Sequence, residues 1–377
     1  MLCAVLLAVA ARLYAQTELR PDYQPMVPGL EYAHVATTNW DNGEPWSIHI
    51  ARLDRSRKDL HVASMLSQNE VFGIAAISVQ ASSVPSTTGI PLVAINTDFC
   101  IIKRDPYQGA PRGLQIMQGE FVSPPFKWSF WVNEDGTMAF GEVGSKCRAT
   151  LPGGQPFPIG LNHECKPNAV VLFTHMLGKS TRATNHLELV LEDLAHHPLS
   201  WRAGGSYSLR VRAVNPAGNS PLSSGTAVLC FGAKVVEKAG QPKPGDEVRV
   251  DLATEPDLSK AVTGSACIFP LILNGAVLKE FEGGKYLLQK HPRTAIGFNS
   301  RYFYQVVVDG RQKALSMGMY PKELAQFMAK LGCTDAMNMD GGGSSTFWLT
   351  GKVRNSPCDK HERHLANGMV IVQRAAP

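Results

Sequence analysis

A glycine-rich turn is the clearest chemical signal in this 377-residue chain: Asp340-Gly341-Gly342-Gly343-Ser344-Ser345. Three consecutive glycines cost backbone entropy, so a fold needs a reason to keep them ordered, and they permit close approach of a ligand to the backbone. Successive N–H groups in such a turn can form an anion-binding nest, to which the two serines add hydroxyl donors. A tight turn capped by an aspartate is the competing interpretation. A nucleotide-binding P-loop is excluded, because no lysine follows at the required spacing.

Two pairs of polar side chains stand where predicted strands end. Asn96 and Asp98 follow one apolar run, and Asn338 and Asp340 follow another. Side chains alternate along a strand, so each pair is expected on one face, with Met337 and its neighbour Met339 packed on the opposite face. For Asn96 and Asp98 the alternative is a turn formed by an asparagine and an aspartate.

Other side chains could contact a phosphorylated ligand. Arg293 and Arg363 each offer a planar fork of donors suited to phosphate, and Asn367 could bind hydroxyl groups. Asp309 ends a strongly apolar strand, although a hairpin Asp-Gly explains it equally. Two histidines within residues 361–364 could ligate a metal only on a helix and have no partner cluster, so we predict no metal site.

Composition and charge narrow the function classes. Hydrophobic residues make up 44% of the chain and charged residues 18%, which is typical of a globular protein. The net charge of +5 comes from scattered lysines and arginines without a basic run. Nucleic acid is therefore not an expected partner, while an anionic substrate is compatible with the charge.

The N-terminal sequence bears on location. Residues 1–15 contain an apolar stretch from Leu2 to Ala11 that ends in small residues, with Ala15 as the expected cleavage point. This length fits a signal peptide and is too short to span a bilayer; a buried helix is the alternative. We expect a signal peptide, no membrane span, and a secreted or periplasmic protein of the cell envelope.

The cysteines give a second, weaker indication. Seven of the eight follow residue 15 and none forms a CxxC pair, which disfavours a zinc ribbon or a thioredoxin-like site. In an oxidising compartment some should pair, with Cys147–Cys165 and Cys333–Cys358 as candidates by proximity. Free thiols in the core are the alternative.

The elements that must position these residues are mainly strands. Residues 46–53 alternate at period two, residues 90–95 form a short apolar run, and residues 336–339 precede the glycine turn, so each is predicted as a strand. Asp135-Gly136 indicates a hairpin. Residues 321–331 are predicted as a helix, because apolar side chains at i, i+3, i+4 and i+7 share one face.

These patterns predict the fold class and domain organisation. We expect an α+β fold of mixed, mostly antiparallel sheets with a few packed helices. The absence of an obvious linker favours a single composite domain over residues 28–374, preceded by a polar arm at residues 16–27.

Taken together, five stretches resemble the phosphodiester glycosidase family in order and spacing over roughly residues 28 to 373. They are residues 94–99, 113–120, 170–184, 291–297 and 306–372. Two positions depart from the family pattern. Thr97 stands where the family usually has glycine, and Phe269 stands where a glycine pair is frequent before proline. These departures leave the reaction class in place and put the identity of the sugar in question.

The resemblance implies an exported hydrolase that cleaves a sugar-1-phosphodiester, or phosphorylated glycan, at the anomeric bond. Asp98, Asp309 and Asp340 are the expected catalytic acids, since such cleavage usually employs two carboxyl groups. The expected ligand contacts are Asn96, Arg293, Asn338, Gly341, Gly342, Gly343, Ser344, Ser345, Arg363 and Asn367. No cofactor is required, although scattered Asp and Asn oxygens could bind a structural calcium. The alternatives are a phosphodiesterase that cuts the P–O bond and a non-catalytic glycan-binding envelope protein.

Overall fold

The computed structural model describes residues 21–39, 42–102, 105–154, 156–194, 197–281 and 284–374. Within these residues strands β1 to β27 accompany only two α-helices. The expected α+β class is therefore wrong, and the fold is mostly β. The helix predicted at residues 321–331 is present. Most of the other segments are short alternating runs separated by turns, and such runs are too short to form helices.

The predicted signal peptide at residues 1–15 lies outside the described residues. Part of the segment expected to be an arm, residues 24–27, forms an edge strand paired with the next one.

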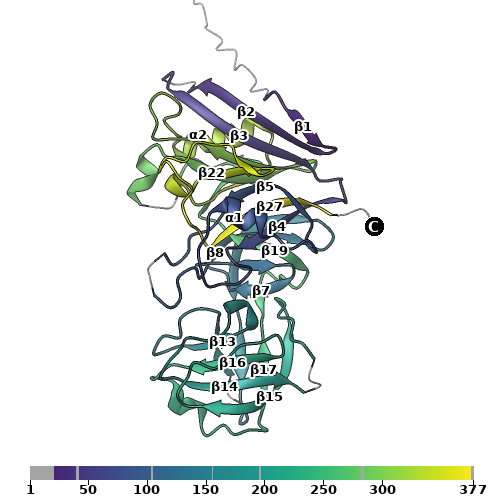
Figure 1. Cartoon of the computed structure of the whole chain (residues 1–377), viewed down its shortest axis with the longest axis vertical. Coiled ribbons are helices and arrows are strands. Elements are labelled where there is room, and N and C mark those ends of the chain that lie inside the picture. Colours follow the sequence, from purple (N-terminus) through teal and green to yellow (C-terminus); the bar gives the residue numbers. More distant parts are fainter. Residues whose placement is uncertain are drawn as a thin grey trace, which may run out of the picture.

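An eight-stranded antiparallel sheet, here the upper sheet, occupies one end of the elongated molecule (Figure 1). Its strand order is β1 (Gln24–Val27), β2 (Leu30–Thr38), β3 (Pro45–Asp54), β23 (Tyr302–Val308), β22 (Arg293–Phe298), β24 (Asp335–Asn338), β20 (Phe269–Leu273) and β21 (Ala276–Val277). The predicted strands at residues 46–53 and 336–339 are thus confirmed as β3 and β24, with the latter ending one residue earlier than expected.

Two smaller sheets lie beside the upper sheet in the middle of the molecule (Figure 1). The five-stranded sheet has the order β26 (Lys352–Val353), β25 (Phe347–Leu349), β5 (Ile90–Asn96), β27 (Asn367–Gln373) and β4 (Leu60–Leu66). The six-stranded sheet has the order β18 (Thr254–Glu255), β9 (Met138–Ser145), β8 (Lys127–Asn133), β19 (Ala261–Ala266), β6 (Gln115–Met117) and β7 (Glu120–Ser123). The apolar run at residues 90–95 is confirmed as β5, and the Asp135-Gly136 hairpin joins β8 to β9.

A second eight-stranded sheet, here the distal sheet, forms the opposite end of the molecule (Figure 1). Its order is β11 (Pro156–Pro158), β10 (Arg148–Thr150), β17 (Glu247–Asp251), β15 (Ser206–Asn215), β14 (Leu187–Asp193), β16 (Thr226–Phe231), β13 (Val170–Phe173) and β12 (Gly160–Leu161).

Helices are few and short. They are α1 (Ile77–Ser82), α2 (Pro321–Lys330) and the single-turn 3₁₀ segments η1 (His175–Leu177), η2 (Val236–Ala239), η3 (Lys285–Leu288) and η4 (Gly342–Ser344). Helix α2 begins with proline at its first turn and buries Leu324, Phe327 and Met328 against the upper sheet, as its spacing predicts. Within the described residues, no helix is long and apolar enough to cross a membrane.

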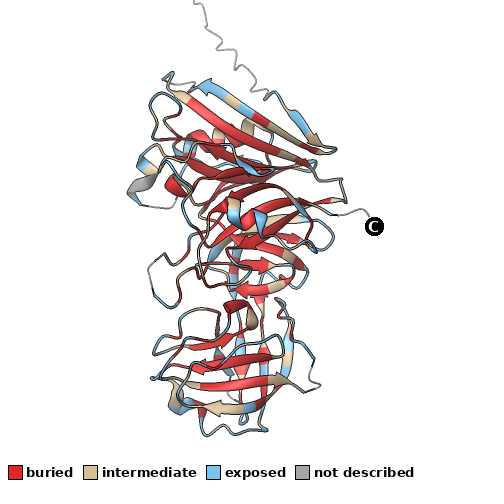
Figure 2. Ribbon diagram, viewed as in Figure 1, coloured by how far each residue is buried: buried red, intermediate tan, exposed pale blue. Residues whose placement is uncertain are grey.

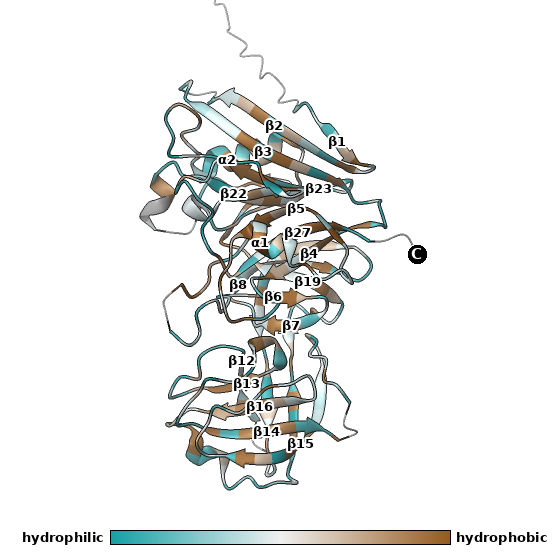
Figure 3. Cartoon of the chain, viewed as in Figure 1, coloured by the Kyte–Doolittle hydropathy of each residue, from teal (hydrophilic) through white to brown (hydrophobic). Residues whose placement is uncertain are grey.

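The hydrophobic cores follow the sheets. Figure 2 shows buried residues along the strands at every level of the molecule, and Figure 3 shows that the same strands carry most of the hydrophobic residues. Met337 and Met339 are fully buried in the core between the upper and middle sheets, as alternation predicts.

The cysteines do not pair. All seven cysteines of the described residues are free, six of them buried, so the candidate bonds Cys147–Cys165 and Cys333–Cys358 are absent. Cys165 lies instead beside Cys230, to whose carbonyl oxygen its thiol donates at 3.5 Å. The two candidate bonds were chosen by proximity along the chain. That criterion failed because strand pairing, and not sequence separation, decides which cysteines are neighbours.

Candidate active site

The ends of β5 and β24 meet where the upper sheet contacts the five-stranded sheet. The Asp340 N–H donates to the Thr97 carbonyl at 2.7 Å, and the Asn96 amide donates to the Asp340 carbonyl at 2.6 Å. Asn96 also accepts a hydrogen bond of 2.8 Å from the Thr294 hydroxyl on β22. Asn96 therefore acts as a cross-link between two sheets, and it places the residues after both strands side by side.

Asp98 is a buried carboxyl, with 7% of its surface exposed. Its Oδ1 accepts the Phe99 N–H at 2.7 Å, and its Oδ2 accepts the Gly113 N–H at 3.0 Å. Desolvation raises its pKa to about 7, with a further contribution from the charge of Asp340, while the backbone donors and Arg112 act in the opposite direction. The hydrogen bond from the Asp340 N–H to the Thr97 carbonyl brings the backbones that carry the two carboxyls side by side.

Asp340 is more accessible than Asp98 but is still poorly solvated. Desolvation raises its pKa to about 6, against the hydrogen bonds from the Ser344 side chain and the Gly341 backbone and the charge of Arg363. Asp98 and Asp340, here called the carboxyl pair, therefore both retain protons to unusually high pH. Neighbouring acids whose pKa values are raised by burial are characteristic of acid–base sites.

Asp309 lies in a separate hydrogen-bond network. Its Oδ1 accepts the Ser356 N–H at 2.8 Å and the Asn355 amide at 3.3 Å, and its Oδ2 accepts the Ser47 hydroxyl at 2.8 Å. His49 Nε2 lies 3.5 Å from the same Oδ2. Asn355 in turn donates to the Ser345 carbonyl at 3.0 Å. Through Asn355, Asp309 is linked to the glycine turn and helps to hold it in place. These contacts give no evidence for its predicted catalytic role.

The backbone of the glycine turn is largely committed to the protein itself. The Gly342 N–H donates to Pro292 O at 2.9 Å, and the Ser344 and Ser345 N–H groups donate to Gly341 O and Gly342 O at 3.3 and 3.2 Å. At Gly342, Ser344 and Ser345, therefore, the N–H groups give no evidence for the predicted anion-binding nest.

Close packing explains why glycines occupy this turn. Gly342 has a φ of +65°, which favours glycine, and a Cβ on Gly343 would lie 2.0 Å from Arg363 Nη2 and 2.1 Å from Asp359 Oδ2. The small residue allows this Arg–Asp pair to lie directly against the turn.

Exposed arginines surround the turn and the carboxyl pair. Arg363 donates to Asp359 at 2.7 Å and to Ser344 Oγ at 3.4 Å, and its charge lowers the pKa of Asp340. Arg311 Nη2 lies 3.1 Å from where a Cβ on Gly342 would be. The charge of Arg112 acts on Asp98. The sequence analysis identified Arg363 but missed Arg112 and Arg311. Of these two, only Arg311 had a signal in the sequence, which was its position shortly after Asp309.

The predicted phosphate ligand Arg293 is placed differently. It is 1% exposed, and its guanidinium donates to Met319 O at 2.9 Å and Gln289 O at 3.4 Å. These bonds hold together two backbone segments. They give the side chain a structural explanation that its sequence context did not reveal.

Besides Asn96, the predicted amide ligands are Asn367 and Asn338. Asn367 Oδ1 accepts from the Thr97 hydroxyl and from the Asp98 N–H, each at 3.2 Å, so it orients the backbone that carries Asp98. Asn338 is 2% exposed, and its Oδ1 has no hydrogen-bond partner among the described residues. An unpaired buried acceptor is costly to maintain.

No group of three or more His, Cys, Asp or Glu side chains that could hold a metal ion occurs in the part of the chain that the structure describes. A calcium site built from carbonyl and amide oxygens is not tested by this observation and stays a prediction.

Comparisons with known proteins give the same family as the sequence motifs. Residues 217–372 match the family model described as phosphodiester glycosidase, which includes Asp340, the glycine turn and Arg363. A 68-residue segment is 35% identical to bovine N-acetylglucosamine-1-phosphodiester alpha-N-acetylglucosaminidase, covering 18% of this chain and 12% of the bovine protein.

Solved structures share the fold. A hypothetical protein from Synechocystis superposes with a TM-score of 0.74 at 18% identity, covering 94% of this chain and 64% of the other. A candidate exported protein from Burkholderia pseudomallei gives a TM-score of 0.67 at 19% identity, with 88% and 74% coverage. The family-model match and the segment shared with the bovine enzyme confirm the resemblance to the phosphodiester glycosidase family that the sequence motifs indicated, over the residues that they cover.

Proposed function

We propose that this protein is a hydrolase that cleaves a sugar-1-phosphodiester at the anomeric C1–O bond. The carboxyl pair carries this proposal, because the hydrogen bonds between Asp340 and the segment Asn96–Thr97 bring two poorly solvated acids side by side. Hydrolysis through an oxocarbenium-like transition state commonly uses two such groups, one protonated and one ionised. The family relationship supports the same reaction class.

The two acids are suited to different roles. Desolvation raises the pKa of both acids, so at least one of them can carry a proton near neutral pH. Asp340 is the more accessible group and lies beside the charge of Arg363, which favours its ionised form, so we assign it the role of base or nucleophile toward C1. Water supplies the hydroxyl group for C1, and its proton ends on the departing phosphate, which leaves as a phosphomonoester.

A phosphate leaving group is already acidic, so stabilising its charge matters more than protonating it. Arg363 and Arg311 are exposed at the glycine turn and provide planar guanidinium donors for this purpose. Asp309, Asn96 and Asn367 position the turn and the carboxyl pair and do not react.

Export stays part of this proposal and depends on the apolar stretch in residues 1–15. Finding the intact N-terminus in protein recovered from the cytoplasm of its host would contradict it.

Hydrolysis in ¹⁸O-labelled water tests the reaction. The substrates are a panel of sugar-1-phosphodiesters, each assayed with and without chelator. We expect the label in the released sugar, which reports C1–O cleavage. Label in the phosphate would identify a phosphodiesterase that cuts the P–O bond, and tight glycan binding without hydrolysis of any substrate would identify a binding protein.

A further inference from the structure

A pocket of about 480 Å³ lies between the five-stranded and the six-stranded sheets. One wall is β4, the last strand of the five-stranded sheet, which contacts β19 of the six-stranded sheet (Figure 1). The other walls come from β8, β19 and the turns that join β3 to β4 and β8 to β9. Small-molecule sites have volumes of about 300–1,000 Å³, so this pocket is large enough to hold a ligand of its own.

The pocket is distinct from the candidate active site. Strand β4 pairs antiparallel with β27, so that Leu66 lies opposite Asn367 and Leu60 lies opposite Gln373. The carboxyl pair lies at the Asn367 end, whereas the pocket is lined by residues 60–63 near the other end. A strand rises about 3.3 Å per residue, so the two sites are on the order of 15 Å apart along the sheet.

The floor of the pocket is apolar. Leu60, Val62 and Val132 are each at most 6% exposed and belong to the core between the upper and middle sheets, against which Met138 packs. The Val62 carbonyl already accepts a hydrogen bond of 3.1 Å from the Thr263 hydroxyl. An apolar group bound on this floor would leave water without breaking that hydrogen bond, which favours binding through the hydrophobic effect.

Positive charges gather at the edge of the pocket where the β3–β4 turn meets the end of β27. Lys58 and Arg374 are exposed there, and within the described residues neither side chain pairs with an acid. The Arg374 N–H donates to the Asp59 carbonyl at 2.8 Å, which brings the end of β27 against the turn that carries Lys58. Arg55 of the same turn donates to the Asn299 carbonyl and adds a third cation. We call this part of the wall the cationic edge.

Hydrogen bonds hold the wall in place. Arg57 forms two hydrogen bonds of 2.9 Å with the Asp59 carboxylate, which also accepts the Gln373 amide at 3.2 Å. On another wall, the Gln118 amide donates to Thr88 Oγ1 at 2.5 Å. These contacts order the pocket before a ligand enters, which lowers the entropic cost of binding.

The remaining ionisable groups of the wall leave the cationic edge available to an anion. Burial, together with the charge of Arg374, lowers the pKa of His61 to about 4, so this histidine is neutral at pH 7. The acids of the wall are Glu134 and Asp135, which belong to the β8–β9 turn, and the Asp135 carboxylate accepts the Thr137 N–H at 2.8 Å. A guanidinium offers planar donors that match either a carboxylate or a phosphate.

We propose that this pocket is a second binding site, which takes a small anion that carries an apolar group, either a carboxylate or a phosphate monoester. The anionic group contacts Lys58 and Arg374 at the cationic edge, and the apolar group lies on Leu60, Val62 and Val132. The site goes beyond the proposed function and does not depend on it, because the carboxyl pair and the glycine turn contribute no residue to its wall.

Calorimetry with octanoate and octyl phosphate tests the site, with octanol and acetate as comparison ligands. We expect saturable binding of at least one amphiphilic anion, with a Kd about 10-fold or more below those of octanol and acetate, since only the amphiphile uses both the floor and the cationic edge. The tighter of the two anions identifies the head group. No saturable binding of either anion would overturn the proposal.

A substitution at the cationic edge has a matched control. Arg374→Gln should raise the Kd of the tighter anion about 10-fold, because it removes a charged donor. Arg212→Gln changes an exposed arginine of β15 in the distal sheet and should leave the Kd within about 2-fold of wild type, because it lies outside the pocket. The same Kd in Arg374→Gln as in wild type would overturn the proposal.

Two further variants test the location, with melting curves to confirm that each is folded. Val262→Phe places a larger side chain in the wall of the pocket and should weaken binding about 10-fold. Arg363→Ala alters the glycine turn and should leave the Kd unchanged. Binding that depends on Arg363 and not on Arg374 would place the anion in the candidate active site and reject the pocket. Intact binding without hydrolysis of any sugar-1-phosphodiester would reject the proposed function and keep the pocket.

Discussion

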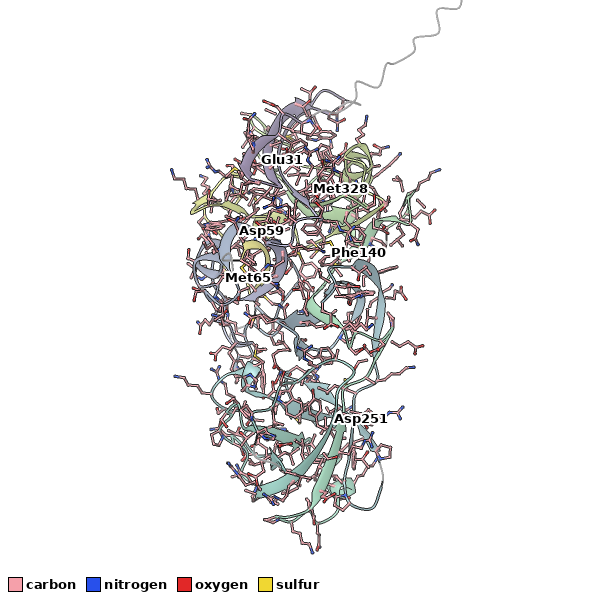
Figure 4. All side chains as sticks on the ribbon, turned by 90° about the vertical axis from the view of Figure 1, so that its right-hand side faces the viewer. Glu31, Asp59, Met65, Phe140, Asp251 and Met328 are labelled. Atoms are coloured by element: carbon pink, nitrogen blue, oxygen red, sulfur yellow. The ribbon has the colours of Figure 1, made fainter. Side chains whose placement is uncertain are left out.

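The distal sheet and the candidate active site both bury carboxyl groups, and the comparison shows what distinguishes a reactive acid from a structural one. In Figure 4, Asp251 of the distal sheet lies toward one end of the molecule and Met328 of α2, beside the upper sheet, toward the other. In the distal sheet, Glu188 is fully buried. It accepts the Thr181 hydroxyl at 2.6 Å and the Ser220 N–H at 2.8 Å.

Asp98 also has a donor on each oxygen, so hydrogen bonding alone does not separate the two acids. The difference is the neighbourhood. Asp98 lies near a second carboxyl, and the loops around it expose Phe99, Arg112 and Phe126. Asp309, with three hydrogen-bond donors, resembles Glu188 more than it resembles Asp98. A buried acid is therefore a better catalytic candidate when a second carboxyl disturbs its ionisation than when donors only satisfy it.

The largest effect on activity is expected from substitution of Asp340, and it should be absent from the matching substitution of Glu188. Asp340→Asn should lower kcat by about 10³-fold while leaving the fold intact, because it removes the ionised member of the carboxyl pair. Glu188→Gln should lower thermal stability, since it disturbs a buried hydrogen-bonded acid, without lowering kcat per folded molecule. Steady-state kinetics with melting curves measure both. An active Asp340→Asn variant would remove the basis of the comparison.

A smaller effect is expected for exposed Arg–Asp pairs. Arg363 pairs with Asp359 at the glycine turn, and Arg249 pairs with Asp251 in the distal sheet. Arg363→Ala should raise KM about 10-fold, because it removes a charged donor to phosphate. Arg249→Ala should have no effect on KM, since surface ion pairs contribute little. Similar KM values for the two variants would argue against phosphate binding at the turn.

Glycine substitutions sharpen the comparison further. Gly343→Ala places a Cβ against the ends of the Arg363 and Asp359 side chains, which can shift, so we expect kcat/KM to fall several-fold and the fold to persist. Gly225 precedes β16 of the distal sheet and has open space around an added Cβ. Gly225→Ala should therefore leave kcat/KM unchanged. A crystal structure of Gly343→Ala with Arg363 in its original position would contradict the steric explanation.

The smallest expected effect is on stability as a function of pH. The raised pKa of Asp98 means that the folded state keeps a proton that the unfolded state loses near its ordinary pKa of 3.8. This contribution to stability is present below that pH and is lost as the pH rises toward 7. Asp98→Asn removes the ionisation, so its Tm relative to wild type should rise by several degrees between pH 4 and pH 8. Parallel Tm profiles for the two proteins would show that burial does not perturb this carboxyl.

Local patterns determined much of the secondary structure. The strands β3 and β5, the β8–β9 hairpin and α2 were all predictable, because alternation, turn residues and helical spacing act over a few neighbouring residues. The burial of Met337 and Met339 followed from the same alternation. The fold class was not predictable from one good helix, since the number of helices depends on every other segment as well.

The sequence by itself determined that acids, amides and a glycine turn stand at the ends of strands, and only the tertiary structure decided which of them meet. Asn96 bonds to Asp340 across 244 positions, and this contact brings Asp98 beside Asp340. Asp309 and Arg293 carry equally suggestive local contexts, yet their side chains are used in supporting networks. The physical reason is that strand propensity is local, whereas the packing of one sheet against another is set by the apolar surface that all the strands bury together.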